Sequence, residues 1–231
     1  MSAEAPVSVV VPLHNGERYV AAALESILGQ TRPPREIIVV DDGSTDGGVE
    51  VAAGFGEKVR VIRQKQSGAA TARNRGIAEI TQPYVGFLDD DDLWVTDKTE
   101  IQLARMESHP ELSGVFGHMS EFTSSDVPAE VAARFKPNEA AQPSTLISCM
   151  LIRADELRRV GPLEEGSRAD FLDWYLRARD MGLRFETLDA LVVRRRIHDM
   201  NFSRNNQVKR DYLKHIKASL DRRRDAGKRG E

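Results

Sequence analysis

The segment VSVVVPLHNGERYVAAALESILGQTRPPREIIVVDDGSTDGG, residues 7–48, decides the fold. It opens with a β-branched run at residues 7–11, and a second apolar run, EIIVV, occupies residues 36–40. Short continuous apolar runs are typical of strands buried on both faces of a parallel sheet. Between the two runs, apolar residues recur at helical spacing from Val20 to Leu28. The segment therefore predicts a strand–helix–strand unit.

The same alternation continues along the next fifty residues. We expect a weak helix at 49–55, strands at 59–64 and 84–89, and a helix at 71–80 between those strands. In open α/β sheets, ligands bind in loops at the carboxyl ends of the strands. The loops that would share this edge begin at Pro12, Asp41, Gln66 and Asp89.

The pattern is less regular beyond Trp94. We expect helices at 97–109, 154–161 and 170–182, and strands at 113–122, 145–153 and 188–198. Residues 123–145 are rich in Ser, Pro, Ala and Glu and have no strong periodicity. The sequence thus predicts one α/β domain with a mostly parallel sheet, flanked by helices and interrupted by an irregular insertion.

Composition and charge restrict the classes of function. The 231 residues include 33 Lys or Arg and 36 Asp or Glu, a net charge of −3. Ten of the basic and four of the acidic residues lie from Arg204 onward, so the preceding chain carries 23 basic against 32 acidic residues. An acidic body argues against a nucleic-acid partner, because phosphate contacts need Lys and Arg.

The single cysteine and the lack of a long apolar run indicate the compartment. Cys149 cannot form an intramolecular disulfide, which fits a reducing environment. No run approaches the roughly 20 apolar residues that a membrane span needs, and no signal-peptide pattern opens the chain. We expect a cytoplasmic protein.

Four aspartates in a row, within GFLDDDDLW at residues 86–94, need a counter-charge. A following helix N-terminus would explain one or two of them. Mg²⁺ or Mn²⁺ would explain the rest, because these ions take oxygen ligands and leave positions for substrate phosphates. Asp89 and Asp91 would point the same way in an extended strand. No Walker or Rossmann phosphate loop follows the first strand, so a metal would have to hold the phosphates.

These motifs carry a resemblance to a known family. Residues 7–48, GAATARNRGI (68–77) and YVGFLDDDDLW (84–94) resemble the start of the large second family of inverting nucleotide-sugar glycosyltransferases. A weaker likeness continues through residues 151–166 and 173–201. The resemblance implies a GT-A fold with a Rossmann-like sheet in a single domain. It also implies a metal-assisted transfer of sugar from a nucleotide diphosphate, UDP in particular, to an acceptor hydroxyl.

The resemblance also implies boundaries. The glycosyltransferase domain would occupy residues 1–206, with a donor-binding half at about 7–97 and an acceptor-side half at about 98–206. Residues 120–145 would face an acceptor, whether glycan, lipid, peptide or small molecule. A basic helix or tail would follow at 207–231.

Roles for individual residues follow from the same resemblance. Nucleotide-sugar contacts fall to Pro12, Leu13, His14, Glu17, Asp42, Arg73, Asp89 and Asp90, and metal binding falls to Asp91 and His198. The bound ion would be Mn²⁺ or Mg²⁺. For Asp42, an Asx-type turn is an equal alternative to a base contact. For His198, the alternative is a hydrogen-bonded structural histidine.

The catalytic base departs from the family pattern. A Glu-Asp pair begins the corresponding family helix, and its aspartate commonly removes the acceptor proton. Alignment on WYLRARDMG places Asp170 at the glutamate and Phe171 at that aspartate. A phenyl ring cannot take a proton, so Asp170, and after it Asp173, becomes the expected base. Both would lie near a helix N-terminus, which favours their charge.

Other classes of function stay open at this point. A nucleotidyltransferase would also use carboxylates and metal, a receiver-like module would bind Mg²⁺ without turnover, and a non-catalytic transferase fold could serve as a partner subunit. The tail places Leu213, Ile216 and Leu220 at helical spacing among basic residues. It would form a helix that docks on its own domain, or that contacts a membrane surface or a partner.

Overall fold

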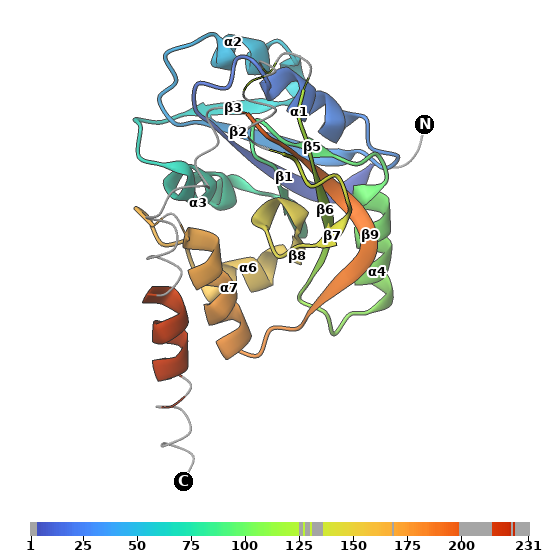
Figure 1. Ribbon diagram of the computed structural model, residues 1–231, viewed down its shortest axis with the longest axis vertical. Coiled ribbons are helices and arrows are strands. Elements are labelled where there is room, and N and C mark those ends of the chain that lie inside the picture. The colour runs from blue at the N-terminus through green and yellow to red at the C-terminus, as the bar shows by residue number, and fades with distance from the viewer. Residues whose placement is uncertain are drawn as a thin grey trace.

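The computed structural model describes residues 4–124, 127, 130, 136–167, 169–198, 214–222 and 224. A single mixed sheet runs through the molecule, and helices pack around it (Figure 1). The strand order is β3-β2-β1-β4-β8-β6-β9-β5, with β7 paired to β6. The α/β architecture expected from the alternation of elements is therefore present.

The first half of the sheet is parallel, as predicted. Its strands are β1 (Ala5–Leu13), β2 (Pro34–Asp41), β3 (Arg60–Arg63) and β4 (Tyr84–Phe87). The connecting helices are α1 (Val20–Leu28), α2 (Gly48–Ala53) and α3 (Ala69–Glu79), with a short 3-10 helix (Gly56–Lys58) after α2. Val9, Val10 and Val11 are fully buried, so both faces of β1 are covered.

The second half of the sheet is mixed. Its strands are β5 (Leu93–Trp94), β6 (Gly114–Phe122), β7 (Gln142–Pro143), β8 (Leu151–Arg153) and β9 (Phe185–Arg196). Its helices are α4 (Lys98–Ser108), α6 (Ala154–Val160) and α7 (Asp170–Asp180). Strand β8 is antiparallel to both β4 and β6, whereas β6 and β9 are parallel.

The strand expected at 145–153 is shorter than predicted. A 3-10 helix (Ile147–Cys149) replaces its first part, and only Leu151–Arg153 forms β8. The side chain of Gln102 in α4 donates a 2.8 Å hydrogen bond to the carbonyl oxygen of Cys149. A side chain thus satisfies a backbone acceptor that a strand would have given to its neighbour.

Trp94 fixes the chain where the acidic segment leaves the sheet. A Cβ on Gly86 would lie 2.8 Å from the Trp94 ring, so only glycine allows the indole to cross β4 there. The indole Nε1 donates to the carbonyl oxygen of Phe87 at 3.2 Å. The tryptophan therefore holds the two ends of the acidic turn together.

A buried lysine lies beside this tryptophan. Lys98, in the first turn of α4, is 1% exposed, and its ammonium sits 4.8 Å from the centre of the Trp94 ring. Lys98 also donates to the side-chain oxygen of Gln102. Burial lowers the pKa of Lys98 from 10.5 to about 7, with the nearby Cys149 thiol opposing that shift. No carboxylate pairs with it among the ion pairs of the described residues.

The helix at residues 214–222 docks against α7, in agreement with one of the two expectations for the tail (Figure 1). His215 and Ser219 are buried, and Ser219 and Arg222 both contact the carboxylate of Asp180. Ile216 and Leu220 are 43% and 60% exposed. The helix thus docks through polar groups rather than through the apolar spacing seen in the sequence; Leu213 lies outside the described residues.

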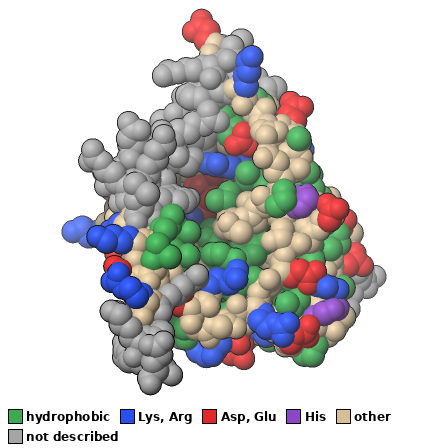
Figure 2. All heavy atoms as spheres, turned by 60° about the horizontal axis from the view of Figure 1, so that its bottom comes forward, with side chains coloured by type: hydrophobic (Ala, Val, Ile, Leu, Met, Phe, Trp, Pro, Cys, Tyr) green, Lys and Arg blue, Asp and Glu red, His purple; other side chains and the backbone are tan. Residues whose placement is uncertain are grey.

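The surface is mixed in character. Figure 2 shows hydrophobic, acidic and basic side chains interspersed on one face, which suits a chain with a net charge of −3. Among the described residues, no helix is both long enough and apolar enough to cross a membrane.

Candidate active site

The loops after β1, β2 and β4 meet at one edge of the sheet. The backbone N–H of Asp42 donates to the Leu13 carbonyl at 2.8 Å, and the backbone N–H of His14 donates to Asp90 Oδ2 at 3.2 Å. Gly16 lies so close that an added Cβ would be 2.3 Å from Asp90 Oδ2. This is the edge that the sequence predicted for a ligand.

His14 connects these loops through both ring nitrogens. Nδ1 lies 3.0 Å from the carbonyl oxygen of Asp42, which can only accept, so Nδ1 carries the proton. Nε2 is then an acceptor and lies 3.0 Å from the Gln66 side-chain amide. Pro12 and Leu13, which precede it at the end of β1, are buried.

Asp42 is held by its own chain. Its carboxylate accepts hydrogen bonds from the Gln64 amide at 2.8 Å and from the backbone N–H groups of Ser67 and Gly68 at 2.8 and 2.7 Å. Gly68 precedes the first residue of α3, so a negative charge lies at that helix N-terminus. The structure thus supports a structural role for Asp42, and a contact with a base stays a prediction.

Glu17 is part of a comparable junction. Its carboxylate accepts from the backbone N–H of Gly47 at 3.1 Å, and its own N–H donates to Asp46 Oδ2 at 2.9 Å. These bonds attach the loop after β1 to the start of α2. Glu17 itself is exposed, so its carboxylate is accessible from solvent.

The four aspartates do not continue β4 as an extended strand. The Asp92 N–H donates to the Asp89 carbonyl at 3.2 Å, which makes residues 89–92 a turn. The expectation that Asp89 and Asp91 point the same way from a strand is therefore wrong. Each carboxylate has a different partner, and the four pairs are Asp89 with Arg73, Asp90 with His14, Asp91 with His198, and Asp92 with Arg196.

Two of these carboxylates, Asp90 and Asp92, have raised pKa values. Burial, and after it the charge of Asp91, raises the pKa of Asp90 well above its usual range. The same two causes raise the pKa of Asp92, although the backbone N–H of Arg196 donates to it at 2.9 Å. Additional positive charge at this turn would oppose both shifts.

Arg73 joins the two halves of the chain. From α3, its NH2 group lies 2.6 Å from Asp89 Oδ1, and its NH1 group lies 3.1 Å from Asp170 Oδ2 in α7. Burial alone would lower the pKa of Arg73, but the charges of Asp89 and Asp170 outweigh it, so the pKa rises. The Arg73 Nε atom is buried and has no hydrogen-bond partner among the described residues. Asp170 is thus placed beside the acidic turn.

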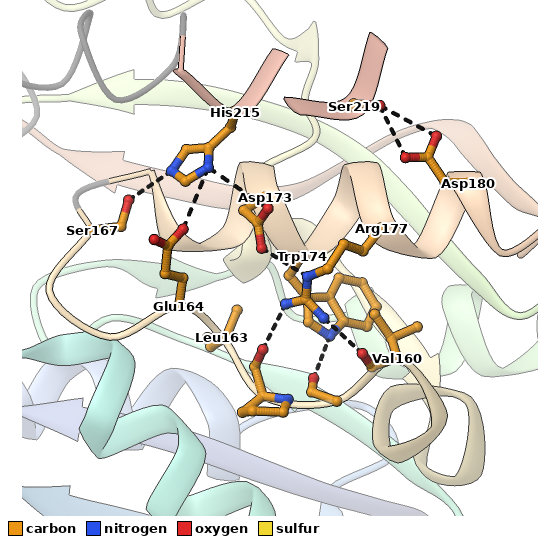
Figure 3. Close-up of polar contacts among 12 residues, drawn as sticks. Val160, Leu163, Glu164, Ser167, Asp173, Trp174, Arg177, Asp180, His215 and Ser219 are labelled. Carbon is orange, nitrogen blue, oxygen red and sulfur yellow. Dashed lines mark hydrogen bonds and ion pairs between the residues drawn. The ribbon is translucent and has the colours of Figure 1, made fainter. Parts of the chain in front are cut away.

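Asp173, the second candidate base, contacts a different set of residues. Its Oδ2 pairs with Arg177 Nε at 2.7 Å, and its Oδ1 faces His215 (Figure 3). Phe171 packs with Phe116, Trp174 and Tyr175. The structure therefore brings Asp170, but not Asp173, into contact with Arg73.

The end of β9 closes the site from the other side. His198 Nε2 lies 2.9 Å from Asp91 Oδ2, and its ring lies 5.0 Å from that of Tyr19. Arg196 donates from Nε to the Asp91 carbonyl and lies over Tyr19 at 4.5 Å. Sequence reasoning missed Asp92, Arg196 and Tyr19; the run RRR at 194–196 was the available signal for the arginine.

Two sequence expectations fall partly outside the described residues. The acceptor-facing stretch at 120–145 is described only at 120–124, 127, 130 and 136–145. The tail at 207–231 is described only at 214–222 and 224.

Comparison with known proteins gives the class. Residues 8–148 match Glycosyl transferase family 2, and the chain belongs to that family. It is 40% identical over 116 residues to an uncharacterized glycosyltransferase of Rickettsia felis, covering 49% of this chain and 19% of that protein. It is 42% identical over 95 residues to the uncharacterized glycosyltransferase YibD of Escherichia coli, covering 40% of this chain and 28% of that protein. The chain thus spans well under half the length of these relatives.

Solved structures give the fold. The Staphylococcus aureus protein TarS, residues 1–349 in complex with UDP-GlcNAc, superposes with a TM-score of 0.75 at 22% identity, covering 94% of this chain and 66% of that one. A second structure of the same protein contains UDP and covers 91% of this chain with a TM-score of 0.68. At this identity the likeness shows the fold, and it confirms the GT-A architecture.

Proposed function

We propose that this chain transfers a sugar from a nucleoside-diphosphate sugar, with UDP as the nucleotide, to an acceptor hydroxyl with inversion at the anomeric carbon. One observation carries the proposal: Arg73 holds Asp170 of the second half beside the acidic turn of the first. Family membership and the UDP-sugar bound to TarS support the donor class. We also propose a cytoplasmic setting, with the exposed Ile216 and Leu220 available for peripheral membrane contact.

The acidic turn fits a divalent cation. Asp91 Oδ2 and His198 Nε2 lie 2.9 Å apart, so one cation could contact both, and carboxylate oxygen is a donor that suits Mn²⁺. The raised pKa values of Asp90 and Asp92 mark a place where positive charge is favourable. We assign Asp91 and His198 as ligands and Asp89 as support, and the bound ion would neutralise the departing diphosphate.

The residues of this chain have separate roles in the displacement. The acceptor oxygen attacks the anomeric carbon while the bond from that carbon to the diphosphate oxygen breaks, and that oxygen keeps the electron pair. The acceptor proton passes to Asp170 Oδ1, the oxygen opposite the one that contacts Arg73. Arg73 orients the carboxylate through its 3.1 Å contact with Asp170 Oδ2.

A non-catalytic partner subunit is the second candidate function. The observation in its favour is Phe171, which occupies the aligned position of the usual base and is buried among aromatic rings. Transfer and hydrolysis assays across UDP-, GDP- and dTDP-sugars separate the two. If the wild type binds donors but neither transfers nor hydrolyses any sugar, the enzyme proposal is wrong.

Calorimetry tests the metal site directly. UDP and GDP are titrated with and without Mn²⁺ into the wild type and Asp91→Ala. We expect UDP binding that strengthens with Mn²⁺ in the wild type and loses that dependence in Asp91→Ala. Equal affinity with and without metal in both proteins would eliminate the metal-site assignment.

A further inference from the structure

Three metal-ligating side chains converge away from the acidic turn. Glu164 comes from the loop after α6, Asp173 from the first turn of α7, and His215 from the helix at 214–222 (Figure 3). One ligand atom from each of the three residues lies within 4.8 Å of the other two. The side chain of His215 is 3% exposed and that of Asp173 is 12% exposed. The cluster is therefore built into the contact between α7 and the last described helix.

The outer atom of each ligand is held by another group. These pairs are Glu164 Oε1 with Lys214 at 3.1 Å, Asp173 Oδ2 with Arg177 at 2.7 Å, and His215 Nε2 with Ser167 Oγ at 2.9 Å. Partners of this kind fix the orientation of ligands around protein-bound metals. The three inner atoms are thereby left facing one another.

The inner distances suit a metal better than hydrogen bonds. His215 Nδ1 lies 3.4 Å from Glu164 Oε2 and 3.6 Å from Asp173 Oδ1, whereas N–H···O bonds usually measure about 2.7–3.2 Å. A tetrahedral zinc ion with ligand bonds of about 2.0–2.2 Å separates its ligand atoms by about 3.3–3.6 Å. The two measured separations agree with the edges of such a tetrahedron.

We propose that Glu164, Asp173 and His215 bind a divalent transition-metal ion, Zn²⁺ by donor set and geometry. The side chain of Glu164 is 39% exposed, so the fourth position opens toward solvent and takes a water molecule. The ion fastens the helix at 214–222 to α7 and to the loop after α6. Asp173 is then a metal ligand and does not accept the proton of the transfer reaction.

Zinc titration of the full chain tests the site. Protein freed of metal by a chelator is titrated with Zn²⁺ by calorimetry, and Asp91→Ala removes the separate site at the acidic turn. In that background we compare His215→Gln, Glu164→Gln and the control His109→Gln. His109 lies outside the cluster, after α4, so His109→Gln removes an imidazole by the same chemical change.

We expect Asp91→Ala to bind one equivalent of Zn²⁺ and the control to match it. His215→Gln and Glu164→Gln should each weaken binding at least about tenfold, because each removes one of three ligands. The proposal is overturned if Asp91→Ala binds no Zn²⁺, or if both ligand variants bind as tightly as the control. Circular dichroism checks that each variant is folded. If His215→Gln loses the helix at 214–222, the zinc affinity of Glu164→Gln tests the proposal instead, because the Glu164 side chain is partly exposed. A protonated His215 between two carboxylates, with no zinc bound, is one of the overturning outcomes.

Discussion

Replacing Lys98 by methionine should change the stability of the protein in opposite directions at low and high pH. The lysine is 1% exposed and contacts Trp94 and Gln102. Its pKa falls from 10.5 to about 7 because burial disfavours the charged form. The folded chain therefore binds fewer protons at this position than the unfolded chain between pH 7 and 10.5. The free energy of unfolding therefore rises with pH across that window. Below pH 7 the full destabilisation caused by burying the charged lysine is present.

The magnitude follows from the size of the shift. A change from 10.5 to about 7 corresponds to a penalty of about 5 kcal/mol at pH 6, and of about 1 kcal/mol at pH 10, where the pH lies close to the unfolded pKa and removing the proton costs little. Methionine keeps the apolar stem but leaves the Gln102 oxygen without its donor, which costs about 1–3 kcal/mol. Lys98→Met should gain about 2–4 kcal/mol at pH 6 and lose about 1 kcal/mol at pH 10.

Urea unfolding at pH 6 and pH 10 measures both values. Lys58→Met is the matched control, because Lys58 is exposed in a short 3-10 helix and should show no such reversal. If Lys98→Met is destabilised equally at both pH values, the lysine is not a buried cation with a lowered pKa. The reasoning would then be refuted.

Further outcomes follow from the site. Asp170→Asn should lower sugar transfer at least about a hundredfold while donor binding persists, and Asp173→Asn should cost less; equal rates in wild type and Asp170→Asn would place the base elsewhere. Truncation after Asn206 should leave donor affinity unchanged but lower the urea midpoint, because Asp173 and Asp180 lose their contacts with the buried His215 and Ser219; an unchanged midpoint would show that the docked helix contributes no stability. Asp91→Ala should abolish the Mn²⁺ dependence of UDP binding in calorimetry, and a retained dependence would move the metal elsewhere.

The first half of the sheet could be predicted from the sequence because its first two strands are continuous runs of apolar, mostly β-branched residues. The β-branched runs at 7–11 and 36–40 are buried on both faces, as continuous apolar runs usually are. The strand expected at 145–153 was too long, since a side-chain bond from Gln102 to Cys149 is a tertiary contact with no local signal. The mixed order of the second half also depends on such long-range pairing.

The candidate site was predictable as a set of residues but not as a set of pairs. The family resemblance placed Arg73, Asp89, Asp91 and His198 in the prediction. It could not show that residues 89–92 form a turn that gives each carboxylate a different partner. Helical spacing likewise grouped Asp170 with Asp173, although partners from α3 and from the helix at 214–222 draw them into separate clusters.

The shared contact of Arg73 gives the two halves of the chain a thermodynamic link. One guanidinium serves Asp89 and Asp170, which lie 81 residues apart in sequence numbering and on different elements. In the proposed mechanism, a ligand that changes the contact of Arg73 with Asp89 would therefore also change its contact with Asp170. Linkage of this kind is reciprocal, so a change at Asp170 would equally alter the contact of Arg73 with Asp89.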